Sequence, residues 1–544
     1  MTTGIRATRF CRRLALCASA CAGLVLCSPA FPLCNLVSDV SDAPQDDRAE
    51  THAERGLQFA KGGNLDSAES ELRNAVALAP TNAEFLRDLG TVLAMEKKLE
   101  ESTSLLQRAL KIDAHDLAAR RYVAANLWQL QRYAEARENL RVLLDAAPGD
   151  AQGLLLLGMV AENSGDYATA AKALTSVPAL VRAQPESIAA LAKSYYHLGE
   201  TQKARAWLKE LQSLRAGVPP VLLGVQIAEE MKDYEMAETL LISLQASDAD
   251  QTEVNYRLAL VKFHAKQFDG SRQILQRLLD EGHKTGAIER LLAACYGAQK
   301  RPDDAIQALR EAIQLEPANE ASYLDLGNML MAERRLTQAS ELARRMANAF
   351  PESSGVLLLK GSIELAMNDY TGAVSSFTRA TQLEPGNANA AIGLARAQNG
   401  AGMPEQAKAI LGSAIERFPE KAAFELEMAR VLLKEAETGD NAAEAKAEGL
   451  LKSAVARDDT LADAHYELGE LALRRDQAAK AVPHLRKAAK LAPASARIHF
   501  ALSRAYRQLG RREEAAQEAS LYDKLKGEES RRAPESSPDA PSSH

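Results

Sequence analysis

The chain has few of the residues that build disulfide-bonded domains or aromatic-rich sheets. Of six cysteines in 544 residues, five lie in the first 34 positions and only Cys295 lies in the body. That distribution excludes a disulfide framework or a zinc-finger spacing in the body of the chain. Aromatic residues make up 5% of the sequence, while Ala and Leu are abundant. This composition is typical of close-packed helices rather than of sheets.

Catalytic signatures are also missing. The sequence contains no Gly-Lys dipeptide, and therefore no Walker-type phosphate loop, and it contains no GxGxxG, HExxH or GxSxG motif. The nine histidines are scattered, and none stands at metal-ligand spacing from another on one helix. We interpret each histidine as a surface or packing residue. The sequence thus predicts a protein that is not an enzyme and that has no catalytic, metal or cofactor site.

Charge of one sign does not accumulate anywhere. The 66 basic and 73 acidic residues are spread along the chain and leave a net charge of -7. The absence of a polybasic block argues against nucleic acid as a partner, and the absence of a long acidic run argues against a basic one.

The first thirty residues have the three parts of a secretory signal. Four arginines without an acid precede an apolar run from Leu14 to Leu26, and Ser28-Pro29-Ala30 supplies small residues for a signal peptidase. We expect residues 1–30 to be this signal, which places the protein outside the cytoplasm, periplasmic or extracellular.

Two alternatives remain for this segment. Ala18-Ser19-Ala20-Cys21 resembles a bacterial lipoprotein box, so Cys21 is a candidate for lipidation. The segment could also stay uncut as a membrane anchor, although Pro29 shortens the usable helix. Membrane contact is expected through this segment alone. The acidic residues 31–48 are predicted to be a flexible spacer, and residues 525–544 a disordered tail.

Between these ends, one pattern recurs every 34 residues. In the window 354–387, Gly361 is at position 8, Ala373 at 20, Phe377 at 24 and Pro385 at 32. Two apolar helical stripes flank a turn, and such a helix pair has too little core to stand alone. Small residues at positions 8 and 20 let the two helices approach, and a larger residue at 24 packs on the next pair. Proline at 32 ends the second helix.

Equivalent marks recur from residue 49 to about residue 524, including Gly56, Gly90, Gly158, Gly327 and Gly469 at position 8. The windows from 218 and 252 are weaker, and residues 422–461 run six residues long, with the insertion expected near the turn at 438–440. We count fourteen units. The marks resemble those of the tetratricopeptide repeat family, in an exported protein of bacterial type. The resemblance implies an all-α fold, an α-solenoid whose antiparallel helix pairs form a right-handed superhelix with a concave groove.

In that family, positions 2, 5, 9, 12 and 13 of each unit commonly face the groove. Here the resemblance places apolar residues at these positions in the middle units, namely Leu155, Met159, Leu222, Tyr256, Leu260, Phe263, Leu324, Met331, Leu358 and Leu365. It places basic residues there in the last units, namely Arg396, Arg430, Lys434, Arg474, Arg497, Arg504 and Arg507. An apolar strip would hold a protein segment by burial, and a basic end would attract carboxylates.

We therefore predict a non-catalytic scaffold for protein–protein interaction, whose partners are proteins or peptide segments held in the groove. A lipid-anchored structural subunit of an envelope assembly or export machine is the alternative. We also expect that charge reversal at Arg430, Arg474 and Arg504 weakens an acidic partner without unfolding the protein.

Mass spectrometry of the mature N-terminus tests the interpretation of the leader. A free N-terminus at Phe31 is expected, because Ala30 completes the cleavage site. A diacylated Cys21 would replace this reading by the lipid anchor, and an intact Met1 would replace it by the uncut segment.

Overall fold

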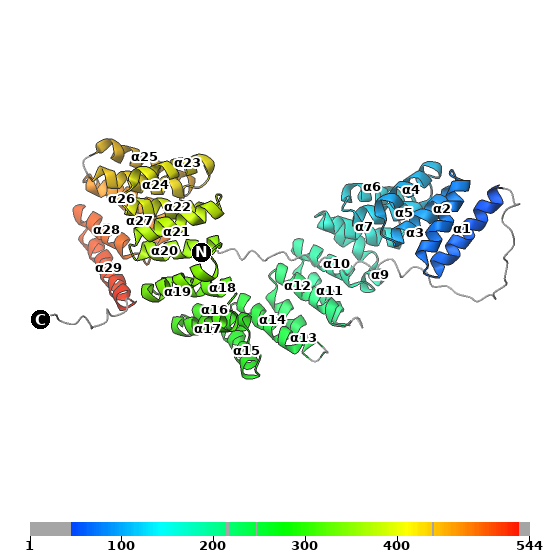
Figure 1. Cartoon of the computed structure of the whole chain (residues 1–544), viewed down its shortest axis with the longest axis horizontal. Coiled ribbons are helices and arrows are strands. Elements are labelled where there is room, and N and C mark those ends of the chain that lie inside the picture. Colours follow the sequence, from blue (N-terminus) through cyan, green and yellow to red (C-terminus); the bar gives the residue numbers. More distant parts are fainter. Residues whose placement is uncertain (1–44, 214–216, 246, 248, 438–439, 533–544) are drawn as a thin grey trace. The chain divides into compact units, whose positions relative to one another are not determined.

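The structure, a computed structural model, describes residues 45–213, 217–245, 247, 249–437 and 440–532. Over these residues it contains 29 α-helices and no strand, and within each compact unit consecutive hairpins lie side by side (Figure 1). The predicted all-α solenoid of helix pairs is confirmed. The expected leader, residues 1–30, lies outside the described residues.

The described chain forms two compact units, with the boundary between Ala265 and Lys266. The first unit stacks six hairpins and also holds a short helix, α9 (Pro178–Arg182), and α14 (Gln251–His264). Its hairpins are α1 (Gln45–Lys61) with α2 (Leu65–Leu78), α3 (Ala83–Met95) with α4 (Leu99–Ile112), α5 (Leu117–Gln129) with α6 (Tyr133–Ala146), α7 (Ala151–Asn163) with α8 (Tyr167–Thr175), α10 (Pro185–His197) with α11 (Thr201–Ser213), and α12 (Val218–Glu230) with α13 (Tyr234–Leu244).

The second unit begins with α15 (Phe268–Asp280) and continues with seven hairpins. These are α16 (Gly286–Ala298) with α17 (Pro302–Leu315), α18 (Glu320–Ala332) with α19 (Leu336–Ala349), α20 (Ser354–Ala366) with α21 (Tyr370–Leu383), α22 (Ala388–Gly400) with α23 (Pro404–Arg417), α24 (Ala423–Ala436) with α25 (Asn441–Arg457), α26 (Ala462–Arg474) with α27 (Ala478–Leu491), and α28 (Ala496–Gln508) with α29 (Arg512–Arg532). These hairpins account for thirteen of the fourteen predicted helix pairs, and α14 and α15, on either side of the boundary, occupy the sequence window of the remaining one.

The turn after each first helix uses a residue with positive φ at position 15, except after α24, where residues 438–439 lie outside the described part of the chain. In the turn between α3 and α4, Lys97 has φ 63° and the next amide, of Lys98, donates to the Leu93 carbonyl at 2.9 Å. This bond satisfies a carbonyl that the end of the helix leaves free. The same position carries Gly63, Gln131, Gly165, Gly199, Lys232, Lys266, Lys300, Arg334, Asn368, Gly402, Asp476 and Gly510, all with positive φ.

The turn between hairpins is set by a cap and a proline. Asn82 and Asp150 stand before α3 and α7, and their side-chain oxygens accept bonds from amides in the first helical turn. At the other end, α2 stops at Leu78 before Pro80, as expected of a residue that cannot continue a helix. Local chemistry therefore specifies where these hairpins begin and end.

Neighbouring hairpins interlock through a large side chain in a gap between glycines. Phe377 on α21 is 2% exposed. A Cβ at Gly361 on α20 would lie 2.8 Å from its ring, and one at Gly393 on α22, in the next hairpin, would lie 2.4 Å away. Leucines take the same place over glycine in other hairpins, for example Leu174 over Gly158. Position 24 therefore joins two hairpins, as the sequence predicted.

Three boundaries differ from the sequence prediction. Helix α1 begins at Gln45, so the last residues of the expected spacer 31–48 are helical. Pro178 interrupts what would be one long second helix, because it lacks an amide hydrogen, and the segment splits into α8 and α9. Helix α29 runs on to Arg532, into the tail that was predicted to be disordered, and Lys526 there lies 5.4 Å from the Tyr522 ring centroid. The sequence of α29 contains no proline, and the first proline that follows the helix is Pro534.

Replacing Gly393 by Ala should destabilise the second unit by about 1–3 kcal/mol, because the added methyl would overlap the Phe377 ring. Gly412→Ala on the next helix, α23, is the matched control: nothing lies within 4 Å of its Cβ position, and it should stabilise by up to about 1 kcal/mol. Urea unfolding followed by circular dichroism measures both. Equal midpoints for Gly393→Ala and the native protein would contradict the interlock.

Candidate functional site

The first helices of the hairpins form the closely spaced side of each unit. In the first unit α1 contacts α3, α3 contacts α5 and α5 contacts α7. In the second unit α18 contacts α20, α20 contacts α22, α22 contacts α24 and α26 contacts α28. Among second helices, such an approach is found for α11 and α13. Helices on the inside of a curved stack lie closer than those on the outside, so within each unit the first helices line the inner wall.

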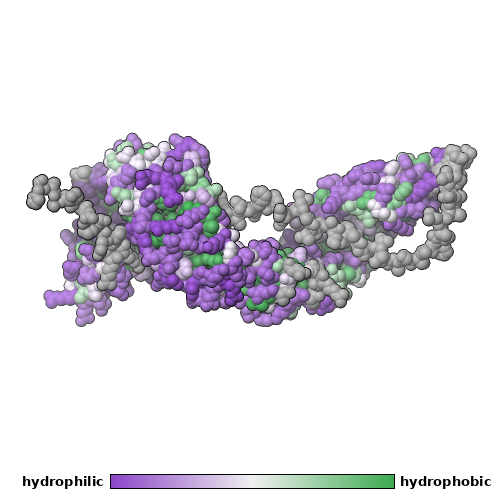
Figure 2. Space-filling model, turned by 60° about the horizontal axis from the view of Figure 1, so that its bottom comes forward, coloured by the Kyte–Doolittle hydropathy of each residue, from purple (hydrophilic) through white to green (hydrophobic). Residues whose placement is uncertain are grey.

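Most of the predicted apolar residues lie partly exposed on first helices. In the second unit, Leu324 and Met331 on α18 pack against the core below them and keep part of their surface free, as do Leu358 and Leu365 on α20. We call these four residues the apolar strip. Figure 2 shows hydrophobic surface in a recess of the second unit, framed by hydrophilic residues.

In the first unit the outcome is mixed. Met159 and Leu222 are partly exposed, and so are Tyr256, Leu260 and Phe263 on α14. Leu155, however, is only 6% exposed and belongs to the core. The assignment of Leu155 to the groove surface is therefore wrong. Helical spacing alone does not show which residues on a helix are buried.

The predicted basic end is largely paired with acids from neighbouring first helices. Arg430 on α24 donates to Glu427 at 2.9 Å, to Asp463 on α26 at 2.7 Å and to Glu467 on α26 at 3.3 Å. Glu427 also accepts from Arg396 on α22. Arg430 is thus the centre of a charge network across three hairpins.

The network extends to α28. Arg497 there donates to Asp463 at 2.5 Å and stacks on Tyr466, with its guanidinium carbon 4.6 Å from the ring centroid. Arg504 donates to Glu470 at 3.1 and 3.2 Å. These acids pair with four of the seven predicted basic residues, namely Arg396, Arg430, Arg497 and Arg504. The spacing in the sequence showed the positive charges but not the acids that pair with them.

Three of the seven predicted basic residues make no ion pair in the described part of the chain. Lys434 donates to the backbone carbonyl of Asn399 at 3.0 Å, and Arg507 donates to Ser503 at 3.0 Å. Arg474, the last residue of α26, is exposed and has no hydrogen-bond partner among the described residues. We call Lys434, Arg474 and Arg507 the free basic group.

Burial and charge oppose each other in the network. Burial raises the pKa of Asp463, but hydrogen bonds and positive charge from Arg430 and Arg497 outweigh it and leave the pKa below its usual value. For Glu467, burial outweighs the attraction of Arg430, and the pKa is raised. Removing Arg430 would leave these carboxylates partly buried and without their main partner. We therefore expect reversal of Arg430 to destabilise the second unit, a cost that the sequence alone did not indicate.

Sequence reasoning missed the inner wall of the first hairpins. Leu57 on α1 and Met95 on α3 are 37% and 39% exposed, and Trp128 on α5 keeps part of its surface free. The Trp128 indole donates to Asn163 at 2.9 Å. These residues occupy positions 9, 13 and 12 of their windows, so the groove positions applied to the middle units would have found them here as well.

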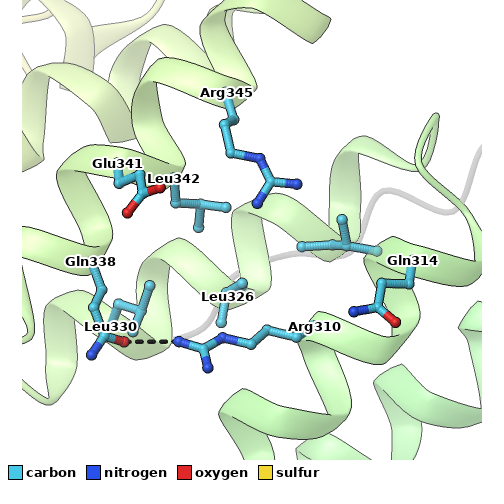
Figure 3. A pocket seen from close by; sticks show the side chains of 9 residues that line it. Arg310, Gln314, Leu326, Leu330, Gln338, Glu341, Leu342 and Arg345 are labelled. Carbon is cyan, nitrogen blue, oxygen red and sulfur yellow. Dashed lines mark hydrogen bonds between the residues drawn. The ribbon is translucent and has the colours of Figure 1, made fainter.

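A shallow pocket of about 290 Å³ lies on the other side of the second unit, between α17 and α19. Figure 3 shows Arg310 reaching Gln338, to which it donates at 3.0 Å, above a floor that includes Leu326 and Leu330. The floor residues are 3% and 2% exposed, so the pocket offers little apolar contact area. We assign it no role.

Groups suited to catalysis or metal binding are sparse. Within the described ranges, no cluster of three or more His, Cys, Asp or Glu side chains could hold a metal ion. In the same part of the chain, none of the helices is long and apolar enough to cross a membrane. Cys295 is buried, its thiol lies 3.3 Å from the Ser271 hydroxyl, and burial raises its pKa.

Two family models of the tetratricopeptide repeat match the chain. One matches residues 298–363 and 364–426, and the other matches residues 54–116, 124–188 and 466–529. Together the matched segments cover more than half of the sequence and lie in both compact units.

Characterised relatives share part of the chain. Protein O-mannosyl-transferase TMTC1 of Homo sapiens is 28% identical over 203 residues, which are 36% of this chain and 23% of the relative. The chain therefore spans about a quarter of that relative's length. Type IV pilus assembly protein PilF of Pseudomonas aeruginosa is 23% identical over 211 residues, 38% of this chain and 82% of the relative.

Among solved structures, the chain is similar to yeast Tom70, with 16% identity and a TM-score of 0.40 over 90% of this chain and 98% of that one. MamA is another, with 20% identity and a TM-score of 0.26 over 31% of this chain and 96% of that one.

Arg430→Glu should destabilise the second unit by about 3 kcal/mol, because it leaves Glu427, Asp463 and Glu467 beside a fourth carboxylate. Arg474→Glu makes the same charge change at an exposed residue and should shift stability by less than about 0.5 kcal/mol. Urea midpoints of the two variants measure the difference. If both variants unfold at the native midpoint, the network does not stabilise the fold.

Proposed function

Because the chain belongs to the tetratricopeptide repeat family, we propose that it is a non-catalytic scaffold that binds segments of other proteins along the inner wall of its first helices. The observation that carries the proposal is the apolar strip. Leu324, Met331, Leu358 and Leu365 keep exposed surface on two adjacent first helices of the second unit. Burying that surface under an apolar side chain of a partner supplies binding free energy of about 25 cal/mol per Å².

The free basic group supports a preference for a partner that also carries acids. Lys434, Arg474 and Arg507 keep charges that no carboxylate of the described chain neutralises. Arg430, Arg497 and Arg504 have their acids already, and a partner would have to displace those carboxylates. The selective charges are therefore a smaller set than the seven that the sequence suggested.

The proposed scaffold works outside the cytoplasm and has no enzymatic activity. The leader pattern supports a location outside the cytoplasm, and it leaves membrane contact to the N-terminal segment. The name of TMTC1 describes a transferase, but the chain spans 23% of that relative. The repeats themselves account for nearly all of the described residues, and we propose no activity for them.

The likeness to PilF favours a second candidate, a subunit of an envelope assembly machine. PilF bears the name type IV pilus assembly protein, and the match covers 82% of it. In this reading the inner wall holds a permanent subunit rather than exchanging partners. A complex that survives purification in high salt would support the second candidate, and one that dissociates on dilution would support the first.

A photo-crosslinking residue at Met331 tests the groove directly. It should join the partner, whereas the same residue at Leu315, which is 42% exposed near the end of a second helix, should not. Once the cross-linked segment is identified, Leu365→Asp should weaken the affinity for that segment about tenfold or more, because a charge would be buried against apolar side chains. Leu315→Asp is the matched control and should leave affinity unchanged. Equal cross-linking at both positions would remove the inner wall as the binding face.

A further inference from the structure

Two histidines that are far apart in the sequence meet inside one hairpin. His465 on α26 and His484 on α27 bring their Nδ1 atoms to 3.2 Å from each other. Their ring centroids are 5.5 Å apart and the planes differ by 34°. The sequence could not reveal this pair, because 19 residues and a turn separate its members.

A carboxylate orients one member of the pair. The Nε2 atom of His465 lies 3.1 Å from Asp459 Oδ1, and Lys487 donates to the other oxygen of Asp459. Because an ionised carboxylate only accepts, Nε2 of His465 carries a proton and donates. In the neutral ring, Nδ1 then holds the lone pair and faces His484.

We propose that His465 and His484 form a two-histidine site for a tetrahedral divalent transition metal such as Zn²⁺. With Zn–N bonds of about 2.0–2.1 Å, two nitrogens 3.2 Å apart subtend an angle of about 103° at the metal, close to the tetrahedral value. Without a metal the two Nδ1 atoms point at each other, as in a hydrogen bond, so each ring has to tilt and the hydrogen between them has to leave when the metal binds. The Asp459 contact on the far nitrogen is the second contact that histidine ligands of zinc usually make.

The site is open, because two protein ligands leave two positions of a tetrahedral metal for water or for a group from a partner. No third His, Cys, Asp or Glu joins them in the described chain. His484 is partly exposed, which gives the metal a route from solvent, whereas His465 is 6% exposed.

Burial lowers the pKa of His484, and the nearby charges of His465 and Lys452 lower it further, so this ring is neutral at pH 7. The charges of Lys452 and Lys487 oppose a cation, so we expect binding weaker than at a structural zinc site.

The next hairpin contains a natural comparison. His499 and Glu518 follow His465 and His484 by 34 residues each, and His499 Nδ1 lies 2.6 Å from Glu518 Oε2. Its Nε2 lies 3.0 Å from the Pro493 carbonyl. Both neighbours of this ring are oxygens, so the comparison pair does not offer a metal two imidazole nitrogens. The pair at 465 and 484 differs from it in having a second histidine where a carboxylate stands.

Isothermal titration of the untagged full-length protein with zinc chloride at pH 7.5 tests the proposal, after alkylation of the cysteines with iodoacetamide. The native protein should bind one more zinc ion than His484→Gln, or bind it at least about tenfold more tightly. His499→Gln is the matched control and should bind as the native protein does. Circular dichroism confirms that each variant is folded.

A gain-of-site variant makes the test independent of any loss of stability. Glu518→His creates the same pair in the last hairpin, with the Pro493 carbonyl in place of Asp459, and should add one zinc ion. At pH 5.5 binding should fall at both pairs, because protons compete for the nitrogens. Identical zinc stoichiometry and affinity in the native protein and His484→Gln would overturn the proposal, and the pair would then be a hydrogen-bonded packing contact.

Discussion

The solenoid depends on contact between hairpins, because no single hairpin buries enough surface to persist alone. Phe377 makes this constraint visible. Its ring fills a space between Gly361 on α20, in its own hairpin, and Gly393 on α22, in the next hairpin. Without either of these two helices the ring would be exposed. Each hairpin is thus part of the core of another, and stability is shared along each unit rather than concentrated in one centre.

The same close packing decides which side chains remain available to a partner. Position 20 carries Ala or Ser and position 8 carries Gly, Ala or Ser in nearly every hairpin, and the residue at 24 is buried, as Leu72, Leu174 and Phe377 are. Surface for recognition is then left on the inner wall, where first helices approach each other and carry residues such as Leu365 and Arg474. Because a repeat adds only a few exposed residues, a partner has to extend over several hairpins to gain affinity.

Charge on the inner wall has two different roles in the second unit. Around Arg430, acids and bases from α22, α24 and α26 satisfy one another, and they tie consecutive first helices together in addition to the apolar contacts. Arg474 and Arg507 lie outside this network and keep their charge for solvent or a partner. The division matters for any mutational study of binding, since the same substitution acts on the fold at one site and on recognition at the other.

The sequence alone determined the architecture, because the signals that place helices and turns are local and recur every 34 residues. Pro80 and Pro385 stop second helices, and residues such as Gly361 and Phe377 report their packing by size. Contacts between side chains on different helices were decided only by the tertiary structure. Leu155 is covered, Arg430 meets acids up to 37 residues away, and His465 meets His484 across a turn. Helical spacing specifies the face on which a residue lies, but the partner it finds there depends on the rotamers and lengths of side chains on neighbouring helices.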